Sequence, residues 1–215
     1  PEVTISELTP RKRRFFLKYL ARFLLLFESV KAKGSFLDNK RVIVTAAPHQ
    51  SGKDEYLMIL MILALDIDVC YLSAKWTMRR IPIPFIKPKD IDNQGIPWPL
   101  GWLQEIVFRK FGAIPVDRKG NSGQYDSVVQ ELYKRDSFLL IITPEGRFDA
   151  TRFRSSFLYL AKELEAEVMP VQIDYEHDTL QFLNSLNLDG SEEEVIQRLR
   201  SCFDGVKGRK SRFKA

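Results

Sequence analysis

The stretch RVIVTAAPHQSGKDEYLMILMILAL, residues 41–65, joins two apolar runs through a short polar segment. The first run, Arg41 to Ala46, is rich in β-branched residues and predicts a buried strand. The second run, Glu55 to Leu65, is apolar over a length that favours a helix. A strand, a short loop and a helix in succession are typical of α/β proteins. The polar segment between them carries His49 and Asp54, which are the first candidate functional residues.

The spacing of His49 and Asp54 is compatible with a general base and a carboxylate that orients it. Imidazole is the side chain best suited to proton transfer near neutral pH, and the chain has only two histidines. Five residues on a continuous helix correspond to a rotation of about 500°, which leaves two side chains on different faces. We therefore expect His49 in the loop and Asp54 in the first turn of the following helix.

Beyond Gly34 the sequence alternates strand-like and helix-like segments, as an α/β layered fold does. The predicted strands are 42–46, 69–73, 113–116, 138–142 and 168–175. The predicted helices are 55–65, 102–111, 125–135, 155–165 and 192–202. Residues 81–101 predict a long loop with five of the eleven prolines, serving as a lid or contact segment or as a rigid surface excursion. We expect one α/β core built on a mixed central sheet flanked by helices.

The basic residues are concentrated at the two ends of the chain. Residues 1–40 hold nine Lys/Arg and four Asp/Glu, and residues 205–215 hold five Lys/Arg and no acid. Such ends favour an anionic surface as partner, although basic termini are also found without one. The Tyr and Trp residues are scattered rather than interleaved with basic ones, which argues against nucleic acid as a partner despite a pI of about 9.2.

The N-terminal segment predicts an amphipathic helix. The run from Phe15 to Phe27 is too short to cross a bilayer, which needs about 20 apolar residues. A basic stripe at helical spacing accompanies it: Arg11, Arg14, Lys18 and Arg22. We expect an interfacial helix with its apolar side in the acyl boundary and its cations on anionic headgroups. The alternative is a helix packed on the domain, with the lysine and arginine stems covering its surface.

These patterns divide the chain into a membrane-interfacial helical segment (1–34), an α/β domain (35–204) and a basic tail (205–215). The two cysteines, Cys70 and Cys202, have no metal-ligand spacing and fit a reduced cytoplasmic setting. We expect a peripheral protein on the cytoplasmic face of a membrane.

Three further blocks follow or begin predicted strands. They are Gly112-Ala113-Ile114-Pro115-Val116-Asp117-Arg118, Pro144-Glu145-Gly146-Arg147 and Val168-Met169-Pro170-Val171. In an open α/β sheet, residues just past strand ends share one crevice, and arginine suits phosphate binding. Together with the first block, over residues 42–171, they resemble the glycerolipid acyltransferases of the 1-acylglycerol-3-phosphate acyltransferase (PlsC-like) type. Lys75 matches a lysine between the first two blocks of that family.

The resemblance implies the fold of that family and a domain, 35–204, that transfers a fatty acyl group in phospholipid biosynthesis. The donor would be an acyl thioester, acyl-CoA or acyl carrier protein, and the acceptor a hydroxyl of a lyso-glycerolipid, with 1-acylglycerol-3-phosphate the first candidate. His49 and Asp54 would form the catalytic pair, and no metal or redox cofactor is implied. The implied acceptor-binding residues are Arg118, Glu145, Gly146 and Arg147. The implied residues of the acyl-donor side or pocket are Ser51, Lys75 and Pro170.

Several alternatives stay open at this point. The acceptor could be another lysophospholipid or an amino-acid or sugar lipid, because Arg147 follows Gly146 without the threonine usual in the family. Arg118 could form a salt bridge, and Glu145 could cap a helix or pair with Arg147. A different class of function is a membrane-docked lipid-binding or scaffolding protein without catalysis. A phosphate-loop interpretation of Ser51-Gly52-Lys53 fails at both ends of the motif, and His177 fits an exposed strand end better than a metal site.

Overall fold

The β-branched run Val42-Ile43-Val44-Thr45 lies in a strand that is buried on both faces. In β3 (Arg41–Ala47), every residue after Arg41 is buried. The strand pairs in parallel with β8 (Phe138–Ile142) on one side and with β9 (Glu167–Asp174) on the other. Continuous burial is characteristic of strands inside parallel sheets, because helices cover both faces. This triplet of strands is the framework of the site described below.

A computed structural model of the chain describes residues 2–5, 7–10, 15–81, 96–116, 123–145 and 152–209. The chain divides into two compact units, residues 1–69 with 136–215, and residues 70–135. The described strands of the first unit also include β1 (Glu2–Thr4), β2 (Lys31–Ser35) and β10 (Thr179–Phe182). Its described helices are α1 (Phe15–Leu25), α2 (Gly52–Ala64), α5 (Ser156–Glu163) and α6 (Glu192–Ser201).

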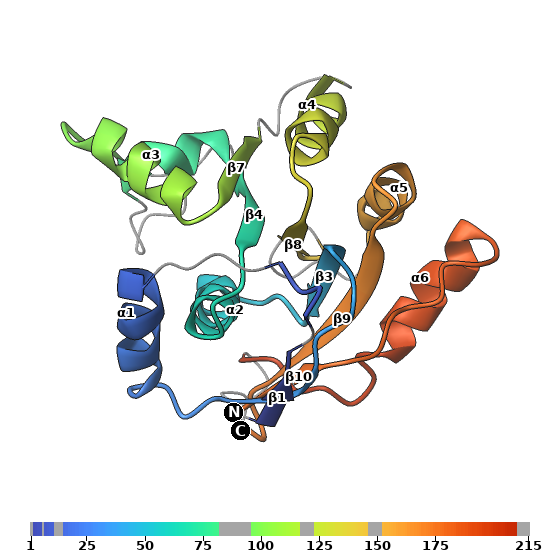
Figure 1. Cartoon of the computed structure of the whole chain (residues 1–215). Coiled ribbons are helices and arrows are strands. Elements are labelled where there is room, and N and C mark those ends of the chain that lie inside the picture. The colour runs from blue at the N-terminus through green and yellow to red at the C-terminus, as the bar shows by residue number, and fades with distance from the viewer. Residues whose placement is uncertain are drawn as a thin grey trace. The chain divides into compact units, whose positions relative to one another are not determined.

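The strands of the first unit form a mixed sheet in the order β1-β2-β10-β9-β3-β8. The β9–β10 pair is antiparallel, and the other pairs in this run are parallel. Within this unit, α1 and α2 lie on one side of the strands and α5 and α6 on the other (Figure 1). Helix α2 is apolar around most of its circumference, as expected of a helix buried between a sheet and another helix.

The second unit begins at Cys70, within β4 (Val69–Ala74), which pairs in parallel with β7 (Ala113–Val116). Between them lie η1 (Lys75–Met78), the short antiparallel pair β5 (Arg80–Ile81) and β6 (Ile96–Pro97), and α3 (Gly101–Lys110). Helix α4 (Gly123–Tyr133) follows. Of the predicted loop 81–101, residues 82–95 lie outside the described residues.

The prediction of an α/β chain with a mixed sheet flanked by helices is confirmed. Every predicted strand and helix is present, with ends that differ by at most three residues. Strands β1, β2, β5, β6 and β10 were not predicted. In β2, the sequence Lys31-Ala32-Lys33-Gly34-Ser35 has only one buried residue, Ala32, so its pairing depends on its neighbours rather than on its own pattern.

Helix α1 combines features of the two arrangements expected for it. The Nζ atom of Lys18 lies 3.0 Å from the Oδ2 atom of Asp66, and the Nε atom of Arg22 donates to the carbonyl of Ala64 at 3.1 Å. These two cations therefore bind the C-terminal end of α2, and they do not project from the protein as a stripe that faces headgroups would. Arg11 and Arg14 lie outside the described residues. Among the described residues, no helix has the length and apolar character needed to cross a bilayer.

Gly34 gives a direct test of this sheet. Its φ is +104°, and a Cβ atom at this position would lie 2.1 Å from the carbonyl oxygen of Phe182 in β10. We expect Gly34→Ala to lower the free energy of unfolding by about 1–3 kcal/mol, because it combines backbone strain with a clash against backbone. Urea denaturation measures this loss. Gly52→Ala, where an added Cβ would meet nothing within 4 Å, is the matched control, and equal losses in the two variants would contradict the assignment of β2.

Candidate active site

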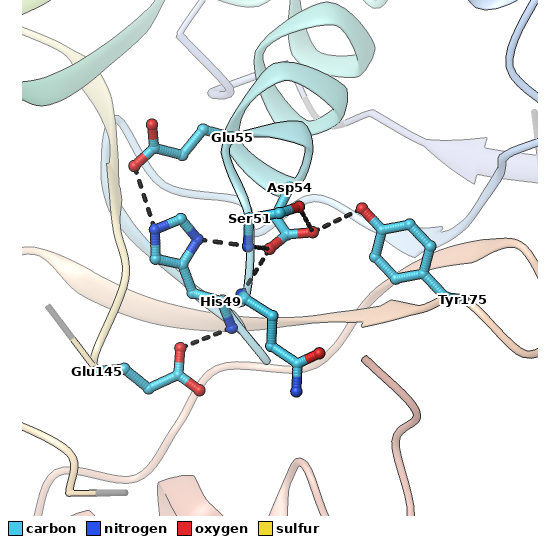
Figure 2. A network of polar contacts seen from close by, with 7 residues as sticks. His49, Ser51, Asp54, Glu55, Glu145 and Tyr175 are labelled. Atoms are coloured by element: carbon cyan, nitrogen blue, oxygen red, sulfur yellow. Dashed lines mark hydrogen bonds and ion pairs between the residues drawn. The ribbon is translucent and has the colours of Figure 1, made fainter. Parts of the chain in front are cut away.

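Three parallel strands end at the same edge of the sheet, and each is followed by a residue of one polar cluster. His49 follows β3, Glu145 follows β8 and Tyr175 follows β9. Since β8 and β9 both pair with β3, the segments beyond their carboxyl ends are neighbours. Asp54 joins the cluster from the first turn of α2 (Figure 2). All four of these residues are buried.

His49 lies in a loop and Asp54 in the first turn of the following helix, as their spacing predicts. His49 lies in the loop after β3, and Asp54 is the third residue of α2, which begins at Gly52. The Nδ1 atom of His49 lies 3.6 Å from the Oδ2 atom of Asp54, and the two side chains are 5% and 1% exposed. This distance is longer than a hydrogen bond, but the carboxylate faces the nitrogen that an orienting group must contact.

The carboxylate of Asp54 is held by several donors. Its Oδ2 atom accepts from the backbone N–H groups of Gln50 and Ser51, each at 2.7 Å. Its Oδ1 atom accepts from the hydroxyl of Tyr175 at 2.6 Å and from that of Ser51 at 3.3 Å. Burial alone would raise the pKa of Asp54, but the hydrogen bonds outweigh it and hold the pKa of this carboxyl below its usual range. Asp54 is therefore a carboxylate at neutral pH.

The second ring nitrogen of His49 faces the half-exposed side chain of Glu55. Its Nε2 atom lies 3.4 Å from the Oε1 atom of Glu55, whose side chain is half exposed. Figure 2 shows the imidazole between the two carboxylates of α2, with Asp54 on the Nδ1 side and Glu55 on the Nε2 side. Because Glu55 reaches solvent, its side chain has room to move when another group approaches Nε2.

Glu145 has a contact that the sequence did not indicate. Its Oε2 atom accepts a hydrogen bond from the backbone N–H of His49 at 2.6 Å, and the residue is 8% exposed. Burial raises the pKa of Glu145, and the bond from the His49 amide opposes this rise only in part. The contact fixes the loop that carries His49, so Glu145 positions the imidazole through the main chain.

The remaining predicted site residues differ in where they lie. Ser51 is the residue before α2 and binds the carboxylate of Asp54 through both its N–H and its hydroxyl. Pro170 is buried within β9, opposite Thr45 of β3. Lys75 is exposed at the start of η1, in the second unit. The predicted acceptor residues Arg118, Gly146 and Arg147 lie outside the described residues.

Two members of the cluster, Tyr175 and Glu55, were missed by sequence reasoning. Tyr175 was placed at the end of the strand 168–175, whereas β9 ends at Asp174 and Tyr175 begins the turn that follows. A tyrosine just past a strand that neighbours the His49 strand is the signal that would have indicated it. For Glu55, the sequence predicts only the start of a helix.

The cluster has elements from which a general base can be built: a buried imidazole, a carboxylate beside its Nδ1 atom and a half-exposed carboxylate beside its Nε2 atom. Within the part of the chain that the structure describes, no group of three or more His, Cys, Asp or Glu side chains is arranged to hold a metal ion. Comparison of the chain with protein-family models and with curated proteins gave no match in either case. The function of the chain is therefore inferred from these residues and from the resemblance of the motif blocks.

Proposed function

We propose that this protein is an O-acyltransferase that moves a fatty acyl group from an acyl thioester to a hydroxyl of a lyso-glycerolipid. The observation that carries the proposal is the buried His49 at a strand end, with Asp54 on its Nδ1 side and the half-exposed Glu55 on its Nε2 side. A pure lipid-binding protein has no need for a buried base with its own orienting carboxylate. The buried His49 and Asp54 therefore favour catalysis over the scaffolding alternative.

In the proposed reaction, the Nε2 atom of His49 accepts the proton of the acceptor hydroxyl while the hydroxyl oxygen attacks the thioester carbonyl carbon. The resulting tetrahedral intermediate collapses, the carbon–sulfur bond breaks, and the thiolate takes the proton from His49. The products are an ester and a free thiol, so no covalent enzyme intermediate is needed. Asp54 keeps the proton of neutral His49 on Nδ1 and stabilises the imidazolium that forms during the step.

Glu55 occupies the approach to Nε2 in the absence of substrate. The acceptor hydroxyl must come within about 3 Å of Nε2, which the Oε1 atom of Glu55 faces at 3.4 Å. We propose that the half-exposed side chain of Glu55 moves toward solvent when the acceptor binds.

The identity of the acceptor follows from the resemblance. A lyso-glycerolipid with a phosphate, 1-acylglycerol-3-phosphate first, is proposed because Arg118 matches the family's phosphate-binding arginine. Release of thiol from an acyl-CoA, measured with and without each member of a lyso-lipid panel, tests this choice. We expect the largest acceptor-dependent rate with the phosphate-bearing lipid. A larger rate with a lipid that lacks phosphate would overturn the choice of acceptor but not the reaction.

Membrane docking through α1 is the second part of the proposal. The outward side of α1 and of the turn after it carries large apolar side chains that are 37–80% exposed: Phe15, Phe16, Tyr19, Leu20, Phe23, Leu26 and Phe27. Because Lys18 and Arg22 bind the end of α2, the cations hold the helix to the protein and leave its aromatic side outward. An exposed apolar helix face of this kind suits the headgroup boundary, where an enzyme would meet its lyso-lipid.

Replacement of Phe23, which is 55% exposed, tests the docking. We expect Phe23→Asp to weaken partitioning onto phospholipid vesicles about ten- to a hundredfold, because a buried Phe contributes about 1.5–3 kcal/mol. Cosedimentation with vesicles measures it. Tyr159→Ser, which removes an exposed aromatic from α5, is the control. Equal partitioning of Phe23→Asp and the wild type would contradict docking through this face.

A further inference from the structure

Tyr175 contacts the candidate site through Asp54 and takes no part in the proton transfer of the proposed reaction. The residue is 6% exposed, and its hydroxyl donates to the Oδ1 atom of Asp54 at 2.6 Å. The Oδ2 atom of the same carboxylate faces the His49 ring and the amides of Gln50 and Ser51. The two oxygens of Asp54 therefore have separate tasks, and Tyr175 approaches from the side opposite to the imidazole (Figure 2).

The position of Tyr175 is fixed by the chain that follows α6. The backbone N–H of Tyr175 donates to the carbonyl of Lys207 at 2.9 Å. The buried Gly208 lies so close to the loop before α2 that an added Cβ would come within 2.5 Å of the Gln50 side chain. Residues 207–208 thus contact both the end of β9 and the segment that carries His49. The C-terminal segment helps to hold Tyr175 against Asp54.

We propose that Tyr175 is a positioning residue for the base: its hydroxyl sets the rotation of the Asp54 carboxylate so that Oδ2 faces Nδ1 of His49. This inference rests on the proposed function. Tyr175 exchanges no proton with Asp54 during turnover, and its hydroxyl remains a donor throughout. Burial, followed by the contact with Asp54, raises the pKa of Tyr175, which keeps the phenol protonated at neutral pH.

The pH dependence of activity tests the role of Tyr175, because its hydroxyl affects the pKa of Asp54. Four titratable or charged groups among the described residues surround the Asp54–Tyr175 pair. They are His49 from the loop, Glu55 from α2, Glu145 after β8 and Arg209 near the C-terminus. The Tyr175 hydroxyl is one of the donors that lower the pKa of Asp54. Without it the pKa of Asp54 should rise, so the orienting carboxylate should be lost at a higher pH than in the wild type.

The test compares Tyr175→Phe with the wild type and with Tyr159→Phe. Tyr159 is a matched control because its hydroxyl donates to a carboxylate, that of Glu192, at 2.5 Å on the protein surface. We expect Tyr175→Phe to lower kcat/KM for acyl transfer about ten- to a hundredfold, as loss of a contact that orients a functional group does elsewhere. Its acidic limb should move to higher pH, whereas Tyr159→Phe should change neither.

A double-variant cycle separates positioning from general stability. In an Asp54→Asn background, Tyr175→Phe should cause little further loss, because its effect passes through the carboxylate. If Tyr175→Phe does not fold, 3-fluorotyrosine at position 175 keeps the ring and makes the hydroxyl a stronger donor. It should move the acidic limb to lower pH. Wild-type rates and pH profiles in Tyr175→Phe, or additive losses in the cycle, would overturn the inference.

An NMR measurement that requires no turnover distinguishes a failure of this inference from a failure of the proposed function. Since the chain has only two histidines, ring-nitrogen NMR signals of His49 can be assigned by comparison with His49→Ala. We expect the proton on Nδ1 in the wild type and in Tyr159→Phe, and a mixture of tautomers in Tyr175→Phe. A wild-type protein without acyl transfer would overturn the proposed function. An unchanged His49 tautomer in Tyr175→Phe would overturn the role of Tyr175, whatever the activity.

Discussion

We expect His49→Ala to lose acceptor-dependent release of thiol from acyl-CoA by about 10²- to 10⁴-fold, which is the usual contribution of a general base. Without the imidazole, only carboxylates remain beside the acceptor position, and a carboxylate is a weaker base than imidazole; the nearest, Glu55, is half exposed to solvent. Asp54 is already committed to several donors, and Glu145 accepts from the main chain. The loss should appear in kcat more than in KM, because the base acts mainly in the transition state.

The controls for this result come from the same chain. The other histidine, His177, is exposed and its Nδ1 atom lies 2.6 Å from the Oδ2 atom of Asp174, so His177→Ala also removes a histidine next to a carboxylate. It should leave activity unchanged. The amide of residue 49 still reaches Glu145 in the alanine variant, and His49→Gln preserves more of the buried volume if alanine destabilises the loop. Equal rates in His49→Ala and the wild type would contradict the role of His49 as the base.

The second large effect is expected from Asp54→Asn, which we predict to lower kcat by about 10³- to 10⁴-fold, as loss of the orienting carboxylate does in serine proteases. The amide cannot reproduce the contacts of the carboxylate, because one of its two positions becomes a donor. That NH2 group would then face either the Tyr175 hydroxyl or the amides of Gln50 and Ser51. Steady-state kinetics with a saturating acceptor measure the loss. A fall of less than tenfold would contradict an orienting role.

The same substitution should change stability in a pH-dependent way. The pKa of Asp54 is lower in the folded chain than in the unfolded chain, so its carboxylate stabilises the fold above the unfolded pKa of about 3.9. This contribution is lost as the pH falls through the folded value. The gap between the wild type and Asp54→Asn should therefore be full at pH 7 and should shrink below about pH 4. Urea midpoints at several pH values measure it, and a gap that is constant over this range would contradict the lowered pKa.

The sequence was sufficient to predict the elements that are continuous and apolar. Strands β3 and β8 are buried on both faces, so they appear in the sequence as uninterrupted apolar runs. Helix α2 begins at Gly52, three residues before the predicted start at Glu55. Its first turn is polar, and the contact of the Asp54 side chain with the Ser51 amide holds that turn. The apolar pattern alone does not mark a start of this kind.

The strands β2 and β10, which were not predicted, are stabilised by pairing with their neighbours in the sheet. Strand β2 contains two lysines and a glycine, and β10 has only four residues. Each lies between two other strands of the sheet, which supply its hydrogen bonds. Short or polar segments of this type have little intrinsic preference for a strand, and context decides their conformation.

The candidate site likewise contains contacts that the sequence predicts and contacts that it does not. His49 and Asp54 are close in sequence, so their spacing and the predicted loop were enough to bring them together. The contacts of Asp54 with Tyr175 and of His49 with Glu145 join residues that are 121 and 96 positions apart. They depend on β3 lying between β8 and β9, an order that the sequence does not state. The amphipathic helix α1 was predicted from its sequence. The contacts of Lys18 and Arg22 with the end of α2 depend on how the two helices pack, which the sequence does not state.

The measurement that tests the central claim most directly follows the acyl group itself. The full chain is incubated with an acyl-CoA labelled in its acyl carbon, vesicles and 1-acylglycerol-3-phosphate, and the lipids are separated. The account predicts that the label enters a doubly acylated lipid, one thiol being released for each ester formed, and that His49→Ala abolishes this product. Label that remains in acyl-CoA, or that appears only as free fatty acid, with each lyso-lipid acceptor and with acyl carrier protein as donor, would contradict acyl transfer by this protein.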